Sequence, residues 1–372
     1  MTTADFPHAD HRARYDRDER QPLENMKKVH TLIIGAGPGG LTCAELLAHH
    51  GREVLVLERK STVGPKVCAG GITAAGLPPD LPADLLEQTF ARQHIFSDMQ
   101  NIVLTEPNQS AMVSTIDRQR LGSWMLAKTL KAGASVRTAA EVREIGVDHV
   151  VLRDGERIGF DHLVGADGST SLVRRHLGLD NNRVGVGVQY HLPHALPDME
   201  WHLSARYFAN GYGWIFPHRH RTSVGAYVDR RTMPARQLQD NLRAWATDRG
   251  LDLSGVKPEA FLINFDFQGW RFGRTFLVGD AAGLASGLTG EGIYPAMLSG
   301  KTVAMTIIND QYRDAGFTNL LKSQQRHRQL VELTGTSRVI CRLVMESLVL
   351  GLRWRIINFS ALEMAAKRGK GQ

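Results

Sequence analysis

The sequence has few cysteines and no long apolar run, and both shortages exclude whole classes of protein. Its three cysteines, Cys43, Cys68 and Cys341, lie far apart without a CxxC pair, so neither a disulfide framework nor a cysteine zinc site is indicated. No segment reaches the ~18 uninterrupted apolar residues that a membrane span needs, since even 339–352 is broken by Arg342 and Glu346. A chain that does not cross a membrane is expected, and a reducing cytoplasm fits the cysteine usage best.

The sequence also lacks a convincing set of metal ligands. Its closest histidine pairs are scattered along the chain: His8 and His11, His191 and His194, His218 and His220. No Cys, Asp or Glu completes a ligand set with any of them. We therefore expect no metal ion.

Positive charge is concentrated at one end of the chain. The formal net charge is +7 over 372 residues, and residues 320–372 alone hold ten Lys or Arg against three Asp or Glu. The rest is neutral, whereas a nucleic-acid-binding protein would spread basic groups over a recognition face. The distribution excludes that class and favours a basic tail near anionic lipid or substrate.

The length and composition predict two domains, since 42% of the residues are hydrophobic and 22% charged. Residues 1–28 are rich in His, Asp and Arg without an apolar run, so we expect a disordered arm and no signal peptide. Residues 29–57 have the pattern of strand, tight turn, helix and strand. A helix at 122–132, a hairpin at 150–159 that turns at Asp154-Gly155, and a buried strand at 163–166 are expected to return the chain to the same sheet.

A different pattern fills residues 183–267, where runs at 201–208, 213–216 and 222–228 predict strands of a largely antiparallel sheet. A helix at 234–249 interrupts it, a strand at 275–278 leads into a helix at 293–310, and residues 317–370 are expected to be helical. The predicted fold combines α/β and α+β parts. It comprises a discontinuous Rossmann-like nucleotide-binding domain (29–80, 111–180 and 272–310), an inserted antiparallel-sheet substrate domain (81–110 and 181–271) and a basic helical C-terminal segment (311–372).

The run Gly35-Ala36-Gly37-Pro38-Gly39-Gly40 places a GxGxxG motif between the first strand and the first helix. Gly35 permits the tight turn, Gly37 lets the backbone approach a pyrophosphate, and Gly40 lets the helix pack on the strand. The helix N-terminus offers free N–H groups to phosphates. Glu58 follows at the end of the second strand, where a carboxylate accepts hydrogen bonds from ribose hydroxyls. A dinucleotide site is therefore predicted, without a choice between FAD and NAD.

Two further segments resemble motifs of the group A flavoprotein hydroxylase-like superfamily, and this resemblance implies FAD. Residues 165–174, Gly-Ala-Asp-Gly-Ser-Thr-Ser-Leu-Val-Arg, are similar to its Asp-Gly motif, and residues 279–283, Gly-Asp-Ala-Ala-Gly, to its Gly-Asp motif. The first domain is thus expected to be an FAD-binding domain. The cofactor-binding residues that we expect are Gly35, Gly37, Pro38, Gly39, Gly40, Glu58, Arg59, Cys68, Ala69, Gly70, Arg118, Asp167, Gly279, Asp280, Gly290, Gly292 and Ile293.

Several of these residues also have a purely structural interpretation. Asp280, at a strand end, can accept a bond from a ribityl hydroxyl, and Gly290 and Gly292 can turn bare N–H groups towards the flavin or form an ordinary helix-start loop. Asp167 can cap the helix that follows it. Arg118 resembles the family arginine near the FAD phosphates; otherwise it is a solvated charge.

Within that superfamily the chain more closely resembles the geranylgeranyl reductases. Residues 65–72, Pro-Lys-Val-Cys-Ala-Gly-Gly-Ile, are similar to their Lys-x-Cys-Gly-Gly signature, and residues 211–217, Gly-Tyr-Gly-Trp-Ile-Phe-Pro, to their Tyr-x-Trp-x-Phe-Pro strand. Ala69 stands where the family commonly has glycine, and Gly287 where proline is expected. These departures leave the substrate open.

The resemblance implies an FAD-dependent reductase that hydrogenates C=C bonds of a geranylgeranyl or other isoprenoid chain, in a prenyl lipid, prenylated pigment or quinone. The hydride comes from FADH2 and a proton from elsewhere. Cys68 and Tyr212 are the candidate proton donors, although both are weak acids, and Cys68 is alternatively a small packing residue. Tyr212 and Trp214 either wall an apolar slot or form a half-buried strand pair.

The electron donor stays open between NAD(P)H, for which no second GxGxxG exists, and a reduced ferredoxin. Two other functions compete. One is an FAD-dependent monooxygenase, hydroxylase or halogenase on the same scaffold. The other is an electron-transfer flavoprotein without a substrate of its own.

The C-terminal residues 336–366 mix apolar groups with Arg338, Arg342, Arg353 and Arg355. This composition is typical of an interfacial amphipathic helix, which would place the protein at the cytoplasmic face of a membrane. A helix that caps the substrate domain, with its apolar face in the core, explains the pattern equally well.

Overall fold

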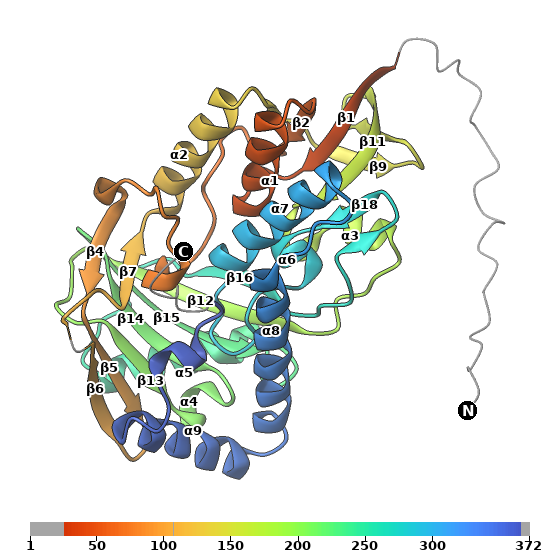
Figure 1. Cartoon of the computed structure of the whole chain (residues 1–372). Coiled ribbons are helices and arrows are strands. Elements are labelled where there is room, and N and C mark those ends of the chain that lie inside the picture. Colours follow the sequence, from red (N-terminus) through yellow and green to blue (C-terminus); the bar gives the residue numbers. More distant parts are fainter. Residues whose placement is uncertain (1–25, 107, 366–372) are drawn as a thin grey trace, which may run out of the picture.

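Two large sheets dominate the computed structural model, which describes residues 26–106 and 108–365 (Figure 1). The first sheet has eight strands in the order β17-β18-β11-β1-β2-β8, and the hairpin β9-β10 joins it through β11. Its strands are β1 (Lys27–Ile34), β2 (Val54–Leu57), β8 (Ser135–Arg137), β9 (Val142–Ile145), β10 (His149–Leu152), β11 (Arg157–Gly165), β17 (Arg271–Phe272) and β18 (Thr275–Leu277).

The parallel strands of this sheet end at one common edge. Ile34 is paired with Leu57 of β2 and with Gly165 of β11, and Gly165 is paired with Leu277 of β18. The residues that follow these strands therefore meet there, as expected for the binding edge of an open parallel sheet.

Small residues let helices pack tightly beside this edge. The helices are α1 (Pro38–His49), α2 (Arg118–Lys131), α3 (Leu172–His176), α6 (Gly279–Ala282) and α7 (Ile293–Ile308), with the 3-10 turn η3 (Gly168–Thr170) before α3. A Cβ atom on Gly39 of α1 would lie 2.9 Å from the Ala296 carbonyl oxygen of α7, and one on Gly300 would lie 2.2 Å from the Gly39 oxygen. The two helices can approach this closely only because glycines occupy the crossing.

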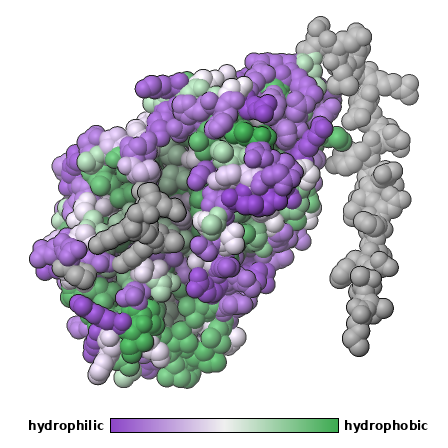
Figure 2. All heavy atoms as spheres, in the orientation of Figure 1, coloured by the Kyte–Doolittle hydropathy of each residue, from purple (hydrophilic) through white to green (hydrophobic). Residues whose placement is uncertain are grey.

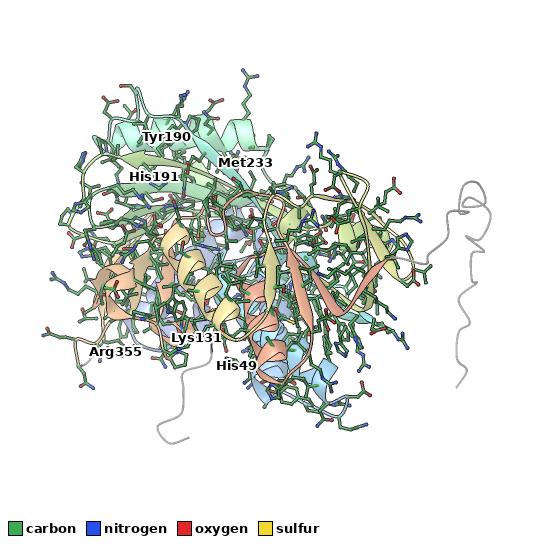
Figure 3. All side chains as sticks on the ribbon, turned by 90° about the horizontal axis from the view of Figure 1, so that it is seen from above. His49, Lys131, Tyr190, His191, Met233 and Arg355 are labelled. Carbon is green, nitrogen blue, oxygen red and sulfur yellow. The ribbon has the colours of Figure 1, made fainter. Side chains whose placement is uncertain are left out.

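The second sheet has seven strands in the order β16-β12-β15-β14-β13-β5-β6. Its strands are β5 (Arg92–Ser97), β6 (Asn101–Thr105), β12 (Val184–Leu192), β13 (Glu200–Leu203), β14 (Tyr212–Pro217), β15 (Thr222–Asp229) and β16 (Glu259–Asn264). Helix α5 (Ala235–Asp248) packs Leu238, Leu242 and Trp245 into its core. Figure 3 shows Tyr190 and His191 of β12 on this sheet, and His49 and Lys131 elsewhere, at the ends of α1 and α2.

A third, three-stranded sheet joins β3 (Gly71–Thr73), β7 (Val113–Ile116) and β4 (Leu86–Phe90) in the order β3-β7-β4, accompanied by the 3-10 turns η1 (Ala74–Gly76) and η2 (Ala83–Leu85). It takes strands from both predicted domains, so the predicted limits at residues 80 and 110 run through it. The exact division into domains stays a prediction.

The C-terminal part of the described chain spans both sheets. Helix α8 (Ala315–Thr334) lies beside α7, and α9 (Arg338–Arg353) packs on β5, β6 and the short α4 (Ala205–Phe208). Residues 354–365, with η4 (Phe359–Leu362), then return towards the first sheet, where Met364 is buried in its core. We call residues 354–365 the C-terminal strap. None of the helices in the described ranges is long and apolar enough to cross a membrane.

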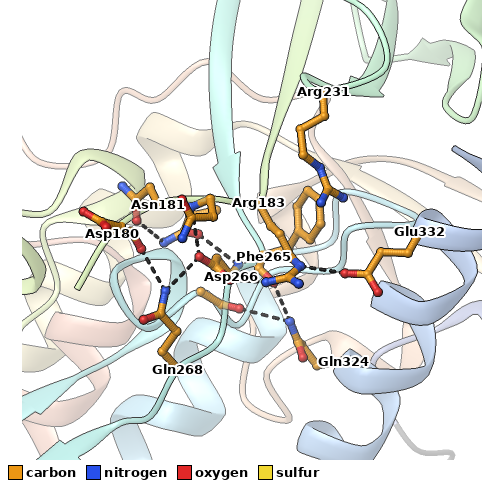
Figure 4. Close-up of polar contacts among 12 residues, drawn as sticks. Asp180, Asn181, Arg183, Arg231, Phe265, Asp266, Gln268, Gln324 and Glu332 are labelled. Atoms are coloured by element: carbon orange, nitrogen blue, oxygen red, sulfur yellow. Dashed lines mark hydrogen bonds and ion pairs between the residues drawn. The ribbon is translucent and has the colours of Figure 1, made fainter. Parts of the chain in front are cut away.

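A buried polar network centred on Asp266 ties the first sheet's helices to β16 and α8 (Figure 4). The Asp266 carboxylate accepts hydrogen bonds from the Asn182 amide, Arg183 and Gln268 at 2.8–3.0 Å. The wholly buried Arg174 lies 3.7 Å from the same carboxylate and donates to the Asp266 carbonyl oxygen at 2.7 Å. Burial by itself would raise the pKa of Asp266, but these donors and the Arg174 charge hold the pKa below its ordinary value.

Three predictions of secondary structure are wrong in part. The strand expected at 201–208 ends at Leu203, and residues 205–208 form α4 instead. The helix expected beyond Arg353 stops because Arg355 adopts a positive φ of 56°, which breaks the helical hydrogen bonding. The arm expected at 1–28 ends earlier, since Lys27 and Lys28 pair with β11. Residues 1–25 of that arm and residues 366–372 of the C-terminal segment lie outside the described residues.

Candidate functional site

A cleft of about 750 Å³ lies at the edge where β1, β2, β11 and β18 end, and it extends to β16 of the second sheet. It brings together most of the residues predicted to bind the cofactor. These are Gly35, Gly37, Pro38, Gly39, Glu58, Arg59, Cys68, Arg118, Asp167, Gly279, Asp280, Gly290, Gly292 and Ile293. Gly40, Ala69, Gly70, Tyr212 and Trp214 lie outside its lining.

The glycine turn after β1 has the geometry that the motif predicts. Gly35 has a φ of 105°, and a Cβ atom there would lie 2.4 Å from the Ala166 carbonyl oxygen. A Cβ on Gly40 would lie 2.1 Å from the Gly35 oxygen, so α1 could not approach β1 with a larger residue. Gly37 differs, because the nearest atom to a Cβ there is 4.0 Å away. The bare Cα of Gly37 therefore leaves room in the cleft for a phosphate at the start of α1.

Glu58 and Arg118 both line the cleft but differ in their hydrogen bonding. The Glu58 carboxylate accepts hydrogen bonds from the Ala36 and Lys60 amides, both at 2.9 Å, so it is fixed at the end of β2. The buried Nε of Arg118 has no hydrogen-bond partner among the described residues. A buried donor without a partner is costly, and a phosphate of the ligand would satisfy it.

Asp167 can both cap helix α3 and contact the cofactor, the two roles that the sequence left open. Its Oδ2 accepts hydrogen bonds from the amides of Leu172 and Val173 at 2.6 and 3.3 Å, which caps the start of α3. Its buried Oδ1 has no partner within the described ranges, and burial raises the pKa of this carboxyl.

Asp280 is held by two side chains on the cleft wall. Its Oδ2 accepts hydrogen bonds from Ser169 Oγ and from Lys66 Nζ, each at 3.0 Å. Lys66 belongs to residues 65–72, which carry the resemblance to the reductases, but the sequence analysis predicted no role for it. Its partner lies 214 residues away in the sequence, and nothing in the local pattern indicates that pairing.

Tyr212 lies outside the cleft lining but close enough to Cys68 for the two side chains to interact electrostatically. Cys68 lines the cleft, and its Sγ accepts a weak hydrogen bond from the Gly70 amide at 3.4 Å. The Tyr212 hydroxyl donates to the Thr289 carbonyl oxygen at 2.5 Å, which braces β14 against the loop that contains Gly290. Burial, with smaller contributions from Cys68 and Glu291, raises the pKa of Tyr212 above its ordinary value.

Aromatic side chains of the second sheet, joined by Phe359 of the C-terminal strap, pack around Tyr212. Trp214 is almost completely buried and donates to Ser223 Oγ at 2.9 Å. The ring centroids of Tyr212 and Trp214 are 5.9 Å apart, and those of Trp201 and Phe216 are 4.7 Å apart. We call this group the aromatic cluster; it comprises Trp201, Tyr212, Trp214, Phe216, Tyr227, Phe261 and Phe359. Trp214 lies inside the packed cluster, away from the cleft surface.

His218 forms a hydrogen bond to the loop that contains Cys68, a role that the sequence analysis did not predict. Its Nε2 donates to the Ala69 carbonyl oxygen at 3.0 Å, and its Nδ1 contacts a Glu87 carboxylate oxygen at short range. A hydrogen bond from His218 lowers the pKa of Glu87. The position of His218 directly after the Tyr-x-Trp-x-Phe-Pro strand was the available signal.

Glu291, between the cleft residues Gly290 and Gly292, also has no predicted role. Its Oε2 accepts a hydrogen bond from the Met364 amide at 2.9 Å, and its buried Oε1 has no partner in the described part of the chain. Burial raises the pKa of this carboxyl to about 7. Nearby, Ser286 Oγ lies 2.8 Å from Nδ1 of the buried His327. The loop 286–291 is therefore attached to both α8 and the C-terminal strap.

The cleft fits a dinucleotide: a glycine turn with open space at Gly37, a fixed acceptor at Glu58 and an unsatisfied donor at Arg118. In the described ranges no three His, Cys, Asp or Glu side chains gather as a metal would require.

Comparisons with known proteins agree with this fit. A family model described as "FAD binding domain" matches residues 28–334. The geranylgeranyl diphosphate reductase of Rhodobacter capsulatus is 28% identical over 74% of this chain and 74% of its own. A digeranylgeranylglycerophospholipid reductase of Methanopyrus kandleri is 27% identical over 77% of this chain and 79% of its own.

A solved structure shares the fold. The geranylgeranyl bacteriochlorophyll reductase-like protein of Thermoplasma acidophilum superposes with a TM-score of 0.73 at 20% identity, covering 87% of this chain and 91% of its own. The family model confirms the predicted cofactor, FAD. The shared fold confirms the predicted mixed α/β architecture. This chain belongs to the FAD-binding-domain family and is an FAD-dependent oxidoreductase related to the geranylgeranyl reductases.

Proposed function

We propose that this flavoprotein reduces isolated C=C bonds of an isoprenoid chain carried by a prenyl lipid, a prenylated pigment or a quinone. The observation that carries the proposal is the apolar part of the cleft lining, formed by Val186 of β12 and by Phe261, Leu262 and Ile263 of β16. Apolar walls with few polar groups suit a hydrocarbon chain. The names of the relatives from Rhodobacter capsulatus and Methanopyrus kandleri support the same substrate class.

The residues of the cleft would hold FAD in the following way. The amides of the turn at Gly35 and Gly37 and the Arg118 side chain would bind its phosphates. Glu58 would accept hydrogen bonds from its ribose, and Asp280, fixed by Lys66 and Ser169, from its ribityl chain. FAD supplies a hydride once it is reduced.

An isolated alkene also needs a proton, and the protein must deliver it. The Tyr212 proton is engaged with the Thr289 carbonyl oxygen, and burial raises the Tyr212 pKa, so Tyr212 is the poorer donor. Cys68, in contrast, lines the cleft. We therefore assign proton delivery to Cys68 and a positioning role to Tyr212, which holds the loop at Gly290.

The decisive experiment is anaerobic. The purified yellow protein is reduced, mixed with geranylgeranyl compounds, and analysed for products that are two mass units heavier per reduced bond, together with flavin reoxidation. Cys68→Ser is expected to lower the rate of reoxidation at least ~100-fold, the scale of a lost proton donor, while FAD stays bound. If no prenyl compound reoxidises the flavin, the proposed reaction is wrong.

The same preparation separates the competing functions. Oxygen uptake coupled to substrate would indicate a monooxygenase or halogenase. Turnover with ferredoxin or quinone and no other substrate would indicate an electron-transfer flavoprotein. Comparing NADH, NADPH and reduced ferredoxin as reductants identifies the electron donor.

A further inference from the structure

Helix α9 has two apolar stripes, and only one of them is used for packing. The inner stripe, Cys341, Met345, Val349 and Leu352, is buried against the second sheet and α4. The capping role that the sequence analysis considered therefore describes one face of the helix. It leaves the other face unexplained.

The outer stripe is exposed and runs along the length of the helix. Val339, Leu343, Leu350 and Trp354 follow one another at intervals of four, seven and four residues, which places them on one side of a helix. Leu343 is 62% exposed, Trp354 70%, and the next apolar residue, Ile356, 79%. Monomeric soluble proteins rarely expose apolar side chains in such a contiguous patch.

The β5–β6 hairpin extends this patch and is rigidly joined to it. Exposed Met99 and Val103 lie on the hairpin. The Glu346 carboxylate of α9 accepts hydrogen bonds from the Met99 amide at 3.0 Å and from Ser97 Oγ at 2.8 Å, and Arg353 donates to the Asn101 carbonyl oxygen at 3.1 Å. Figure 2 shows hydrophobic residues gathered at the lower end of the molecule, where Figure 1 places α9 and β6.

Arginines flank the patch. Arg338, Arg342, Arg353 and Arg355 are all exposed, and within the described ranges Arg338, Arg353 and Arg355 form no ion pair. The nearby carboxylates are already engaged: Asp98 accepts from Ser204 at 2.7 Å and lies 3.9 Å from Arg342, and Glu346 binds the hairpin. The patch therefore combines apolar side chains, a tryptophan and uncompensated positive charge.

We propose that this surface, defined by Met99, Val103, Val339, Leu343, Leu350, Trp354 and Ile356 with the four arginines, docks the protein on an anionic lipid bilayer. Apolar side chains enter the boundary between headgroups and acyl chains, tryptophan prefers that depth, and the arginines pair with anionic headgroups. A second copy of this chain fits less well, because a two-fold interface through this face would bring the arginines of both copies together.

The test uses the full-length, FAD-loaded protein without any substrate, so its outcome is independent of the proposed reaction. Sedimentation with phosphatidylcholine vesicles is compared with sedimentation with vesicles that also contain phosphatidylglycerol. Binding is expected with the anionic vesicles and is expected to fall as salt is raised. Arg338→Gln combined with Arg355→Gln should weaken binding at least about tenfold. Leu343→Ser combined with Trp354→Ser should weaken it to a similar degree.

Matched controls lie at the opposite end of the molecule. Leu130→Ser combined with Val147→Ser removes exposed apolar side chains, and Arg52→Gln combined with Lys131→Gln removes exposed charges; neither pair should change vesicle binding. The flavin absorbance of every variant verifies its fold. Absence of wild-type binding to anionic vesicles, or equal binding by the patch variants, would overturn the proposal. So would analytical ultracentrifugation that shows a dimer which the patch variants disrupt.

Discussion

Glu291 illustrates how one buried side chain makes stability depend on pH. Its pKa is raised to about 7 from 4.5 by burial, so the folded protein retains a proton that the unfolded chain releases. The stability that this proton supports is complete below pH 4.5 and is lost as pH rises through 7. The loss is on the order of 3 kcal/mol, from the size of the shift.

Glu291→Gln keeps an acceptor for the Met364 amide but cannot ionise. We expect the variant to gain stability relative to the wild type as pH rises from 5 to 8, measured as the difference between the two urea unfolding free energies. His327, whose pKa is lowered by burial to about 4, acts in the opposite direction, but it is present in both proteins and cancels. Exposed Glu53→Gln is the control. Parallel pH profiles for wild type and Glu291→Gln would contradict the assignment.

At the scale of the element, two glycines of the strand–turn–helix from β1 to α1 have different roles. Gly40 is needed for folding, and Gly37 for cofactor binding. Gly40→Ala puts a methyl group 2.1 Å from the Gly35 oxygen, so α1 must move away from β1. Overpacking of this kind costs about 1–3 kcal/mol of unfolding free energy, and FAD is expected to be lost as well.

Gly37→Ala should behave differently. Gly37 has a φ of −78°, which alanine adopts easily, and open space surrounds its Cα on the cleft side. The FAD-free variant is therefore expected to unfold at the wild-type urea concentration, while its affinity for FAD, measured by titration of the FAD-free protein, falls at least ~10-fold. Equal loss of stability in both variants would show that Gly37 also has a packing role.

At the scale of the whole molecule, Asp266 joins parts of the chain that are distant in sequence. It compensates the charge of the wholly buried Arg174 and accepts a hydrogen bond from Arg183, which in turn donates to Glu332 of α8 at 2.6 Å.

Removing one partner of a buried ion pair leaves the other charge uncompensated. Asp266→Ala is therefore expected to lower the unfolding free energy by about 3–5 kcal/mol, whereas exposed Asp240→Ala should change it by less than about 0.5 kcal/mol. Because the pKa of Asp266 is held low, the wild type should lose this contribution as pH falls. A cost for Asp266→Ala no larger than that of the control would show that Arg174 is satisfied without it.

The sequence by itself determined what depends on near neighbours along the chain. The strand–turn–helix at 29–50 with its dinucleotide motif and the hairpin turning at Asp154-Gly155 were predicted because a glycine turn or an alternating pattern acts over a few residues. The choice of FAD came instead from the resemblance of residues 165–174 and 279–283 to known motifs. The same locality explains the errors: a periodic pattern continues past Arg353, but a positive φ at Arg355 ends the helix.

Only the tertiary structure decided which distant groups meet. Lys66 with Asp280, His218 with Ala69, and Glu291 with Met364 are pairs separated by 73 to 214 residues, and no local pattern encodes them. The composition of residues 336–366 agrees with an interfacial helix and with a capping helix, yet it cannot say which apolar side chains the second sheet covers. That choice depends on where β5, β6 and α4 lie in space, because burial is a property of the packed molecule and not of the helix.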